Sequence, residues 1–225
     1  MFGVTGPGAM GILSTTDPVR DYNLKPLTFV VRTGGWLFRQ RTWLPLPLVA
    51  ALLVTPPPGD APVASLWIIG AAVVALGEGI RLWAVHHIGA ISRTRSDRLG
   101  PLIASGPFGY VRNPLYVGNI LLWTGFALSA RLAWLAPIIV VLLALEYHAI
   151  VRWEEGLLAE RIGEPYRQYV ARVPRWLPSP ASAAAPAGTV TFSWRQTFFS
   201  ERGTLIAIGA GFLLLSLKAW LVARF

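Results

Sequence analysis

Apolar residues along this chain gather into long runs that are separated by short polar or proline-rich breaks. The clearest runs cover residues 62–85, 132–150 and 203–222, each close to the roughly 20 residues that a helix needs to cross a bilayer. A further run begins at Pro114, which suits the first turn of a helix because the amide that proline lacks has no helical partner there. The run at 43–54 is shorter and contains two prolines. The pattern predicts an all-α, polytopic integral membrane protein with about five transmembrane helices.

Composition supports a membrane location. Hydrophobic residues make up 54% of the chain and charged residues 14%, whereas soluble domains carry about 25% charged residues. The chain has no Cys, which excludes disulfides and thiolate metal sites. A net charge of +9 would suggest nucleic acid in a soluble protein, but here we expect it to reflect topology and attraction to anionic membrane lipids. We therefore expect no nucleic-acid partner.

The distribution of basic residues predicts the orientation of the helices. Sixteen of the 20 Lys and Arg residues lie in residues 1–41, in the loop 86–113 or in the stretch 151–202. Lys and Arg are enriched in the cytoplasmic loops of membrane proteins. The N-terminus and these two other stretches are therefore expected to be cytoplasmic.

The same pattern divides the chain into four segments. Residues 1–41 are expected to form a basic cytoplasmic or interfacial arm, because no apolar core followed by a cleavage site indicates a signal peptide. Residues 42–178 form the membrane core. Residues 179–202, which begin with an Ala, Ser and Pro-rich stretch, are expected to link it to a C-terminal transmembrane helix at 203–225.

Four polar residues lie near the end of the apolar run at 62–85 or just after it. Glu78 and Arg81 are three residues apart and share a helix face. We interpret them as an intrahelical ion pair whose Arg81 extends outward to the membrane surface, the alternative being the wall of a cavity. His86 and His87 follow, but adjacent His side chains point in different directions from one helix, so no metal site is predicted.

Two polar clusters flank the hairpin of membrane helices that begins at Pro114. Before the hairpin, Arg112 and Asn113 stand where a loop becomes a helix, and helix N-termini attract anionic groups. After the hairpin come Glu154 and Glu155. A hairpin brings both clusters to the same side of the bilayer, where such residues are expensive to place and usually mark a site.

The two clusters resemble the isoprenylcysteine carboxyl methyltransferase family and the related phospholipid N-methyltransferases and bacterial integral-membrane methyltransferases. The family pattern is Gly-Pro-Tyr-Arg-x-x-Arg-His-Pro-x-Tyr-x-Gly, followed after a hairpin by Glu-Glu-x-x-Leu-x-x-x-Phe-Gly-x-x-Tyr-x-x-Tyr and then Val-Pro-Arg-x-x-Pro. The matching residues are Gly106, Pro107, Arg112, Pro114, Tyr116, Gly118, Glu154, Glu155, Leu158, Gly163, Tyr166, Tyr169, Val173, Pro174, Arg175 and Pro178. Phe108, Gly109 and Asn113 stand where the family has Tyr, Arg and often His. A role of that His in proton transfer cannot be carried over, because an amide does not titrate near neutral pH.

The resemblance implies transfer of a methyl group from S-adenosyl-L-methionine to a lipidic or prenylated acceptor at the cytoplasmic face of a bacterial inner membrane. The residues expected to bind the cofactor are Arg112, Asn113, Pro114, Tyr116, Gly118, Glu154, Glu155, Tyr166, Tyr169 and Arg175. The residues expected to be catalytic are Arg152, Glu155 and Arg175. No Gly-x-Gly-x-x-Gly segment follows a strand, so the sequence offers no soluble nucleotide-binding alternative.

The acceptor has two interpretations. O-methylation of a lipid-linked carboxylate, as in isoprenylcysteine, is expected first, and it needs no base because Arg152 or Arg175 can orient the carboxylate. N-methylation of a phospholipid headgroup is the alternative, in which Glu146, Glu155 or His148 would accept a proton. An alternative of another class is a catalytically silent scaffold that retains the fold, which the departures from the pattern leave open. The sequence identifies no protein partner.

Overall fold

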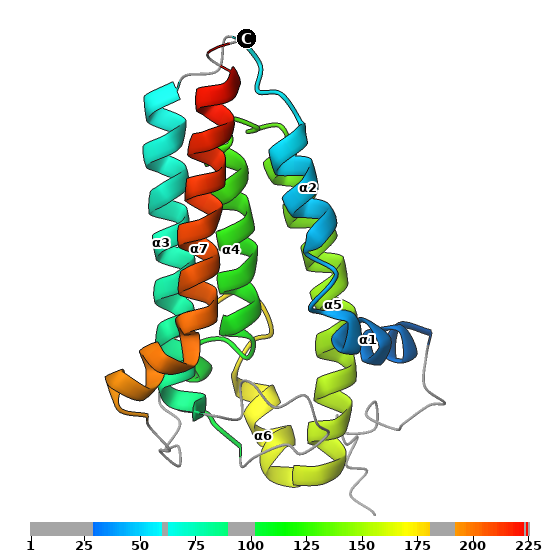
Figure 1. The fold of residues 1–225 in the computed structure, drawn as a ribbon. Helices are drawn as coiled ribbons and strands as arrows, with labels where there is room; N and C mark the ends of the chain where they lie inside the picture. Colours follow the sequence, from blue (N-terminus) through cyan, green and yellow to red (C-terminus); the bar gives the residue numbers. More distant parts are fainter. Residues whose placement is uncertain (1–28, 60–62, 90–101, 181–191, 223, 225) are drawn as a thin grey trace, which may run out of the picture.

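The structure is a computed structural model that describes residues 29–59, 63–89, 102–180, 192–222 and 224, and these residues form helices without strands (Figure 1). The elements are α1 (Phe29–Gln40), α2 (Leu46–Val54), α3 (Val63–Ile88), the 3₁₀ helix η3 (Gly106–Gly109), α4 (Pro114–Ser129), α5 (Leu135–Ile162), α6 (Glu164–Arg172) and α7 (Trp194–Val222). The all-helical prediction is confirmed for this part of the chain.

Three of the described helices are long and apolar enough to cross a membrane. They cover Ala64–Ile88, Leu135–Ile162 and Trp194–Val222. The expected count was about five, but α2 has nine residues and α4 has 16, so both are shorter than a full span. Figure 1 shows α3, α4 and α7 side by side.

Several helix boundaries differ from the predicted ones. The fourth helix of the sequence pattern, expected to end near residue 150, continues to Ile162. The last helix begins at Trp194, so residues 194–202, expected as linker, are its first turns. The start of α4 at Pro114 is as predicted. The N-terminal arm before residue 29 lies outside the described residues, as do five of the basic residues used for orientation, namely Arg20, Lys25, Arg93, Arg95 and Arg98.

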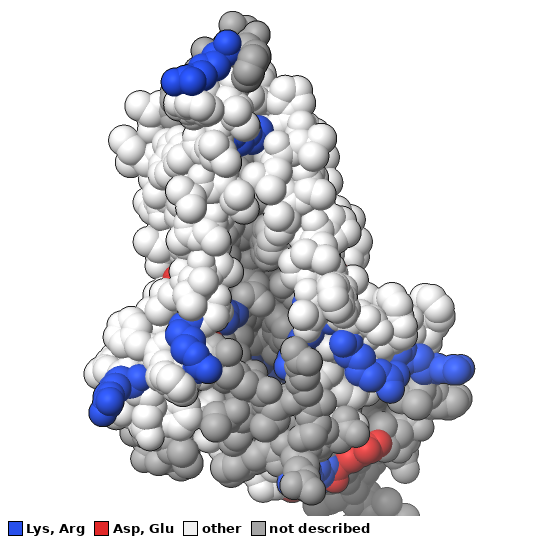
Figure 2. Space-filling model, viewed as in Figure 1, with Lys and Arg blue, Asp and Glu red and all other residues white. Residues whose placement is uncertain are grey.

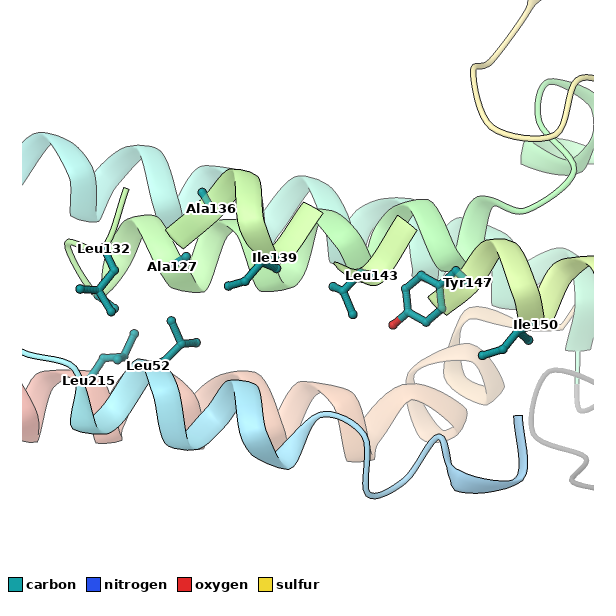
Figure 3. Packing of buried hydrophobic residues seen from close by; sticks show 10 residues of the cluster. Leu52, Ala127, Leu132, Ala136, Ile139, Leu143, Tyr147, Ile150 and Leu215 are labelled. Carbon is teal, nitrogen blue, oxygen red and sulfur yellow. The ribbon is translucent and has the colours of Figure 1, made fainter. Parts of the chain in front are cut away.

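The main apolar core lies where α2, α4, α5 and α7 meet (Figure 3). Leu132 and Ile139 are fully buried in it, and Leu52 and Leu215 approach from α2 and α7. Helices in lipid associate through close packing rather than through exclusion of water, so interdigitated side chains of this kind hold the bundle together.

Small residues bring α3 and α4 into direct backbone contact. A Cβ atom added to Gly77 would lie 2.7 Å from the carbonyl oxygen of Gly118, and one added to Gly118 would lie 2.6 Å from Cγ of Arg81. Only glycine leaves room for such an approach. The contact holds the motif-bearing end of α4, which starts at Pro114, against the part of α3 that carries Arg81.

The helix α1 lies across α5 rather than along it (Figure 1). It is amphipathic, with Phe29, Val30 and Trp36 exposed and Gly34 and Gly35 buried. A helix with exposed large apolar residues and basic residues on one surface is typical of the membrane interface. That the arm lies at the membrane interface stays a prediction.

Candidate active site

A cavity of about 800 Å³ lies among the helices, within the range of about 300–1,000 Å³ that ligand pockets occupy. Its lining comes from α1, α3, α4, α5, α6 and α7, with the segment before α2 and the stretch before α4 that contains η3. Figure 2 shows the molecule hollowed between α7 and α2, with basic side chains in the depth of the hollow. The cavity therefore extends from the motif-bearing end into the level of the apolar helices.

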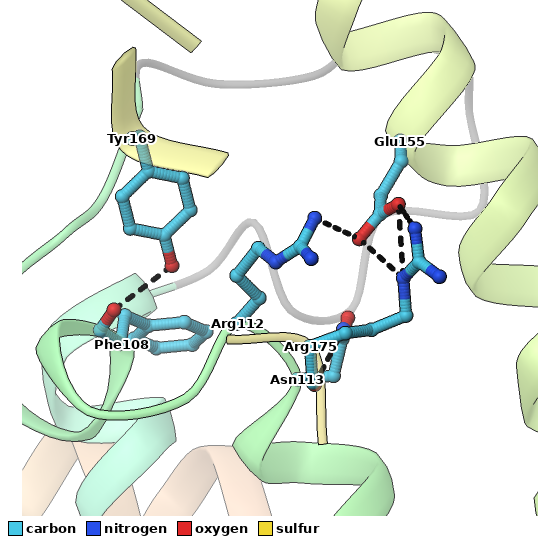
Figure 4. Close-up of polar contacts among 6 residues, drawn as sticks. All are labelled: Phe108, Arg112, Asn113, Glu155, Tyr169 and Arg175. Carbon is cyan, nitrogen blue, oxygen red and sulfur yellow. Dashed lines mark hydrogen bonds and ion pairs between the residues drawn. The ribbon is translucent and has the colours of Figure 1, made fainter. Parts of the chain in front are cut away.

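One carboxylate holds two guanidinium groups at the motif-bearing end (Figure 4). An oxygen of Glu155 accepts a hydrogen bond from Nη1 of Arg112 at 2.7 Å, and the other accepts one from Nη2 of Arg175 at 2.6 Å. Nε of Arg175 donates to the same carboxylate. We call Glu155, Arg112 and Arg175 the carboxylate clamp, and it joins α5 to the loop before α4 and to the segment after α6.

Backbone contacts reinforce the carboxylate clamp. The amide of Arg112 donates to the carbonyl of Pro174 at 2.9 Å, and the side-chain amide of Asn113 donates to the carbonyl of Arg175 at 3.2 Å. The chain after α6 thus runs back along the loop that precedes α4. The two motif clusters, far apart in the sequence, meet in space as expected, and Asn113 uses the hydrogen-bonding ability that its amide retains.

Glu154 faces a different environment from its neighbour. Adjacent residues on a helix point about 100° apart, so only one of the two carboxylates can enter the carboxylate clamp. The Tyr116 hydroxyl donates to Glu154 at 3.1 Å, and the Tyr116 ring lies 4.7 Å from that of Tyr147. All three line the cavity.

Two tyrosines of α6 form the wall at the motif-bearing end. The chain turns between α5 and α6 at Gly163, whose φ of 69° is a left-handed conformation that glycine adopts without strain. The turn buries Tyr166 and Tyr169 against the loop before α4. The hydroxyl of Tyr169 donates to the carbonyl of Phe108 at 2.9 Å, which fixes η3.

These two tyrosine hydroxyls stay protonated at neutral pH. Burial raises the pKa of Tyr166, as does the nearby Glu155 carboxylate, with Arg112 acting in the opposite direction. Burial also raises the pKa of Tyr169, against the effect of Arg112. Neither residue is therefore a base at neutral pH, and Tyr169 acts as a hydrogen-bond donor.

A second charged cluster lines the cavity at the level of the apolar helices. Nη2 of Arg81 donates to Glu201 at 2.6 Å and to the Thr204 hydroxyl at 3.3 Å, and Nη1 donates to Asn119. Nε of Arg81 lies 3.4 Å from Glu78. The ion pair expected with Glu78 is present, but the expected outward extension of Arg81 is wrong, because the guanidinium turns inward toward α7.

Most of the expected cofactor-binding residues come together. Eight line the cavity, namely Arg112, Asn113, Pro114, Tyr116, Glu154, Glu155, Tyr166 and Tyr169. Three expected site residues do not line it. Arg175 contacts it only through the carboxylate clamp, Gly118 packs against α3, and Arg152 is exposed.

The expected proton acceptors have different surroundings. Glu155 is taken up by the carboxylate clamp, and His148 is exposed and absent from the cavity wall. Glu146 lines the cavity, and it has no hydrogen bond or ion pair within the described part of the chain. An intramembrane carboxylate of this kind is a functional-site candidate.

Sequence reasoning missed Asn119, Glu201 and Thr204. The last two lie on α7, which the hydropathy pattern treated as linker followed by an anchor. A usable signal was present: Glu201 is an acidic residue at the border of a long apolar run, where a charge needs a partner. Within the described residues, no group of three or more His, Asp or Glu side chains is arranged to hold a metal ion.

The central part of the chain is similar to a known protein family. Residues 66–164 match the family model described as phospholipid methyltransferase, which confirms the resemblance drawn from the two motif clusters. The match indicates a membrane methyltransferase. It includes most of α3 and all of α4 and α5, and it ends at the first residue of α6, so that α7 lies outside it.

Two curated relatives match about half of the chain. The nickel-cobalt-cadmium resistance protein NccN of Alcaligenes xylosoxydans xylosoxydans is 30% identical over 115 residues, 51% of this chain and 51% of the relative. The cobalt-zinc-cadmium resistance protein CzcN of Cupriavidus metallidurans is 28% identical over 114 residues, 51% of this chain and 48% of the relative. The chain thus spans about half the length of the curated relatives it matches. No solved structure matches it.

Proposed function

We propose that this protein is an S-adenosylmethionine-dependent methyltransferase that acts on a lipidic acceptor at the edge of the membrane. The observation that carries the proposal is a single cavity with two chemically different ends. One end is bounded by the carboxylate clamp and the tyrosines of α6, and the other lies among apolar helices. Such a cavity suits a reaction between a polar donor and a lipid.

The motif-bearing end fits the polar groups of the methyl donor. Nε of Arg112 is buried and has no hydrogen-bond partner within the described residues. Arg112 with the start of α4 would hold the donor's carboxylate, because helix N-termini and guanidinium groups both favour anions. Glu154 would accept hydrogen bonds from the donor's amine or ribose hydroxyls. When bound, S-adenosylmethionine supplies a methyl group that is activated by the positively charged sulfur.

The chain's contribution to the reaction is alignment and exclusion of water. A displacement requires donor and acceptor in line, and a rigid clamp between helices reduces the entropy lost in reaching that geometry. Glu155 keeps Arg112 and Arg175 in place, and Tyr169 keeps η3 in place. The buried tyrosine wall excludes solvent from this end.

We propose an amine, as in a phospholipid headgroup, as the first candidate for the acceptor's nucleophile. The observation in favour is Glu146, a carboxylate that lines the cavity and has no hydrogen-bond or ion-pair partner among the residues that the structure describes. An ammonium group must lose a proton before it attacks, and Glu146 is placed to accept it. This assignment reverses the order expected from the sequence, in which a carboxylate acceptor came first.

A lipid-linked carboxylate is the second candidate, and Arg81 is the observation in its favour. The Arg81 guanidinium lines the cavity at the level of the apolar helices, where it could orient a carboxylate that needs no base. We further propose that the motif-bearing end faces the cytoplasm, as the positive-inside rule predicts. Figure 2 supports this orientation, since Lys and Arg gather mainly at the end where α1 lies.

Methyl transfer to defined acceptors tests the proposal. Purified protein in nanodiscs would receive S-adenosylmethionine with a tritiated methyl group and either phosphatidylethanolamine or N-acetyl-S-farnesylcysteine. Alkali releases methanol from methyl esters but not from N-methyl groups, so it separates the two products. Alkali-stable label supports the amine and volatile label supports the carboxylate. Absence of label with both acceptors, from a folded protein, contradicts the proposed function.

A further inference from the structure

The C-terminal helix α7 contributes directly to the cavity, although it lies outside the stretch that matches the methyltransferase family. Glu201, Gly203, Thr204 and Ala207 of α7 line the cavity. Most of the large apolar residues of α7 are exposed, as expected of a helix that faces lipid. Its polar residues at the cavity are therefore exceptions to its general character.

Glu201 is the most deeply buried charged residue of α7. Its side chain is 3% exposed, and it lies 2.6 Å from Nη2 of Arg81, whose side chain is 13% exposed. Burial of a charge within a membrane protein is costly unless a partner of opposite charge is present. The pair joins two residues that lie 120 positions apart in the sequence, one on α3 and one on α7. It fixes the position of the Arg81 guanidinium.

The Arg81 guanidinium retains capacity for a ligand. Its hydrogen bonds to Asn119, Glu201 and Thr204 use three of the five N–H donors that an arginine carries. Nε lies 3.4 Å from Glu78 in an ion pair without a hydrogen bond, which leaves one N–H of Nη1 without a side-chain partner within the described residues. The remaining donor belongs to a group that lines the cavity. An oxyanion is the ligand chemistry that suits a guanidinium held in this way.

The opposite end of α7 is also fastened by a polar contact. The Lys218 ammonium donates to the carbonyls of Leu52 and Thr55 at the C-terminus of α2, each at 2.6 Å. Polar contacts near both ends, including one between His86 and Thr197, thus hold a helix whose remaining surface is largely apolar. The register of α7, and with it the position of Glu201, is set at both ends.

We propose that Glu201 is a positioning residue of the acceptor site, which holds Arg81 at the cavity wall so that it binds an oxyanion of the lipid acceptor. In an amine phospholipid this oxyanion is the phosphate, and in a prenylated cysteine it is the carboxylate. Thr204 supports the same guanidinium. The helix α7 is therefore part of the methyl-transfer unit rather than an added anchor. This inference rests on the proposed function.

Kinetics of four variants test the inference. Glu201→Gln, Arg81→Gln and the double variant would be compared with Arg202→Gln, a change at the exposed neighbouring residue of the same helix. The readouts are the KM and kcat for whichever of the two acceptors the wild type methylates, and calorimetric affinity for S-adenosylmethionine. Glu201→Gln is expected to raise acceptor KM about tenfold with a smaller change in kcat, because a binding contact is lost.

Three further results are expected. Affinity for S-adenosylmethionine stays at the wild-type value, the double variant is no worse than Arg81→Gln alone, and Arg202→Gln behaves as wild type. An acceptor KM within twofold of wild type in Glu201→Gln, or multiplied effects in the double variant, would overturn the inference. Lack of any wild-type methylation would overturn the proposed function and this inference together.

A milder variant covers the case in which Glu201→Gln does not fold, which loss of S-adenosylmethionine binding would reveal. Thr204→Val removes one hydrogen bond to Arg81 and no charge. It is expected to raise acceptor KM about threefold, as the loss of a single hydrogen bond does. An unchanged acceptor KM in folded Thr204→Val would overturn the inference.

Discussion

The molecule contains two clusters of three charged residues with opposite compositions. In the carboxylate clamp, one carboxylate, Glu155, lies between the guanidinium groups of Arg112 and Arg175. In the cluster around Arg81, one guanidinium lies between the carboxylates of Glu78 and Glu201. The first carries a surplus positive charge and the second a surplus negative charge when all groups are ionised.

The difference teaches how one cavity can accept two different molecules. A positive surplus at the motif-bearing end favours the anionic part of a polar donor. Among the apolar helices, Glu146 on the cavity wall favours a cationic group such as an amine. The Arg81 guanidinium, held by Glu78 and Glu201, is proposed to bind the oxyanion of the same lipid. The five predictions below test this contrast, from the largest expected effect to the smallest.

Loss of Glu155 is expected to have the largest effect on stability. Glu155→Ala leaves two half-buried guanidinium groups without their shared partner, and breaking a buried ion pair on one side costs about 3–5 kcal/mol. The thermal unfolding midpoint in detergent would measure the loss. Glu160→Ala, an exposed acidic residue on the same helix, is the matched control and should unfold like wild type. Equal midpoints for both variants would mean that the carboxylate clamp does not hold the helices.

Loss of Glu146 is expected to lower the turnover number without changing the affinity for the methyl donor. Glu146→Gln should lower kcat for an amine acceptor about 100-fold, the scale of a general base, while S-adenosylmethionine affinity stays unchanged. Turnover of a carboxylate acceptor should not change, because that reaction needs no base. The two kinetic assays of the labelled methyl group measure both. Undiminished methylation of an amine by Glu146→Gln would remove Glu146 from the mechanism.

Gly118→Ala tests whether the close contact between α3 and α4 positions the Arg81 side chain. The new methyl group would meet Cγ of Arg81 and the Gly77 carbonyl, and such overpacking costs about 1–3 kcal/mol. The expected result is a lower unfolding midpoint together with a raised acceptor KM. Gly209→Ala on α7, where nothing lies within 4 Å, is the matched control. If both substitutions behave alike, the α3–α4 contact does not position Arg81.

Tyr169→Phe tests the tie between α6 and η3. It removes the hydrogen bond to the Phe108 carbonyl, which is expected to cost about 1 kcal/mol and to weaken S-adenosylmethionine binding severalfold. Calorimetry and thermal unfolding would measure the two effects. Tyr110→Phe, at a more exposed ring, serves as the control. Wild-type affinity in Tyr169→Phe would show that η3 is held by packing alone.

The smallest effect is expected for an ion pair outside both clusters. Arg167 and Glu164 pair across one turn of α6, 2.8 Å apart, with both side chains exposed. Exposed pairs contribute little because water and salt screen them. Arg167→Gln should therefore leave the unfolding midpoint, the donor affinity and the acceptor KM at wild-type values. A large loss in any of the three would show that charge in general, rather than the two clusters, governs the site.

Local patterns in the sequence predicted much of the motif-bearing end. Pro114 marks the start of α4 because its ring suits a first helical turn, and the hairpin was expected to bring the clusters of Arg112 and Glu155 to the same side of the bilayer. These are contacts that a hairpin necessarily brings together. Role assignment was less successful: Arg152 is exposed although it was expected to be catalytic. The pair Glu154 and Glu155 could not be assigned individually until their directions on α5 were known.

The Arg81 cluster could not be predicted in the same way. Its two partners on α7 come after an Ala, Ser and Pro-rich stretch of the sequence. No helical spacing relates residues that lie 120 positions apart. Hydropathy alone gave Arg81 an outward direction, because a long side chain near a helix end usually reaches the interface. A facing carboxylate reverses that preference, and the partner becomes visible only when α7 packs beside α3.

The most direct test of the account is donor binding at the carboxylate clamp. Calorimetry of S-adenosylmethionine with wild-type protein in nanodiscs would be compared with a Glu155→Ala, Arg175→Ala double variant and with the Glu160→Ala control. The account predicts binding by wild type and by the control, with loss of at least about 100-fold in affinity in the double variant. Equal binding by all three proteins, or no binding by folded wild type, would contradict it.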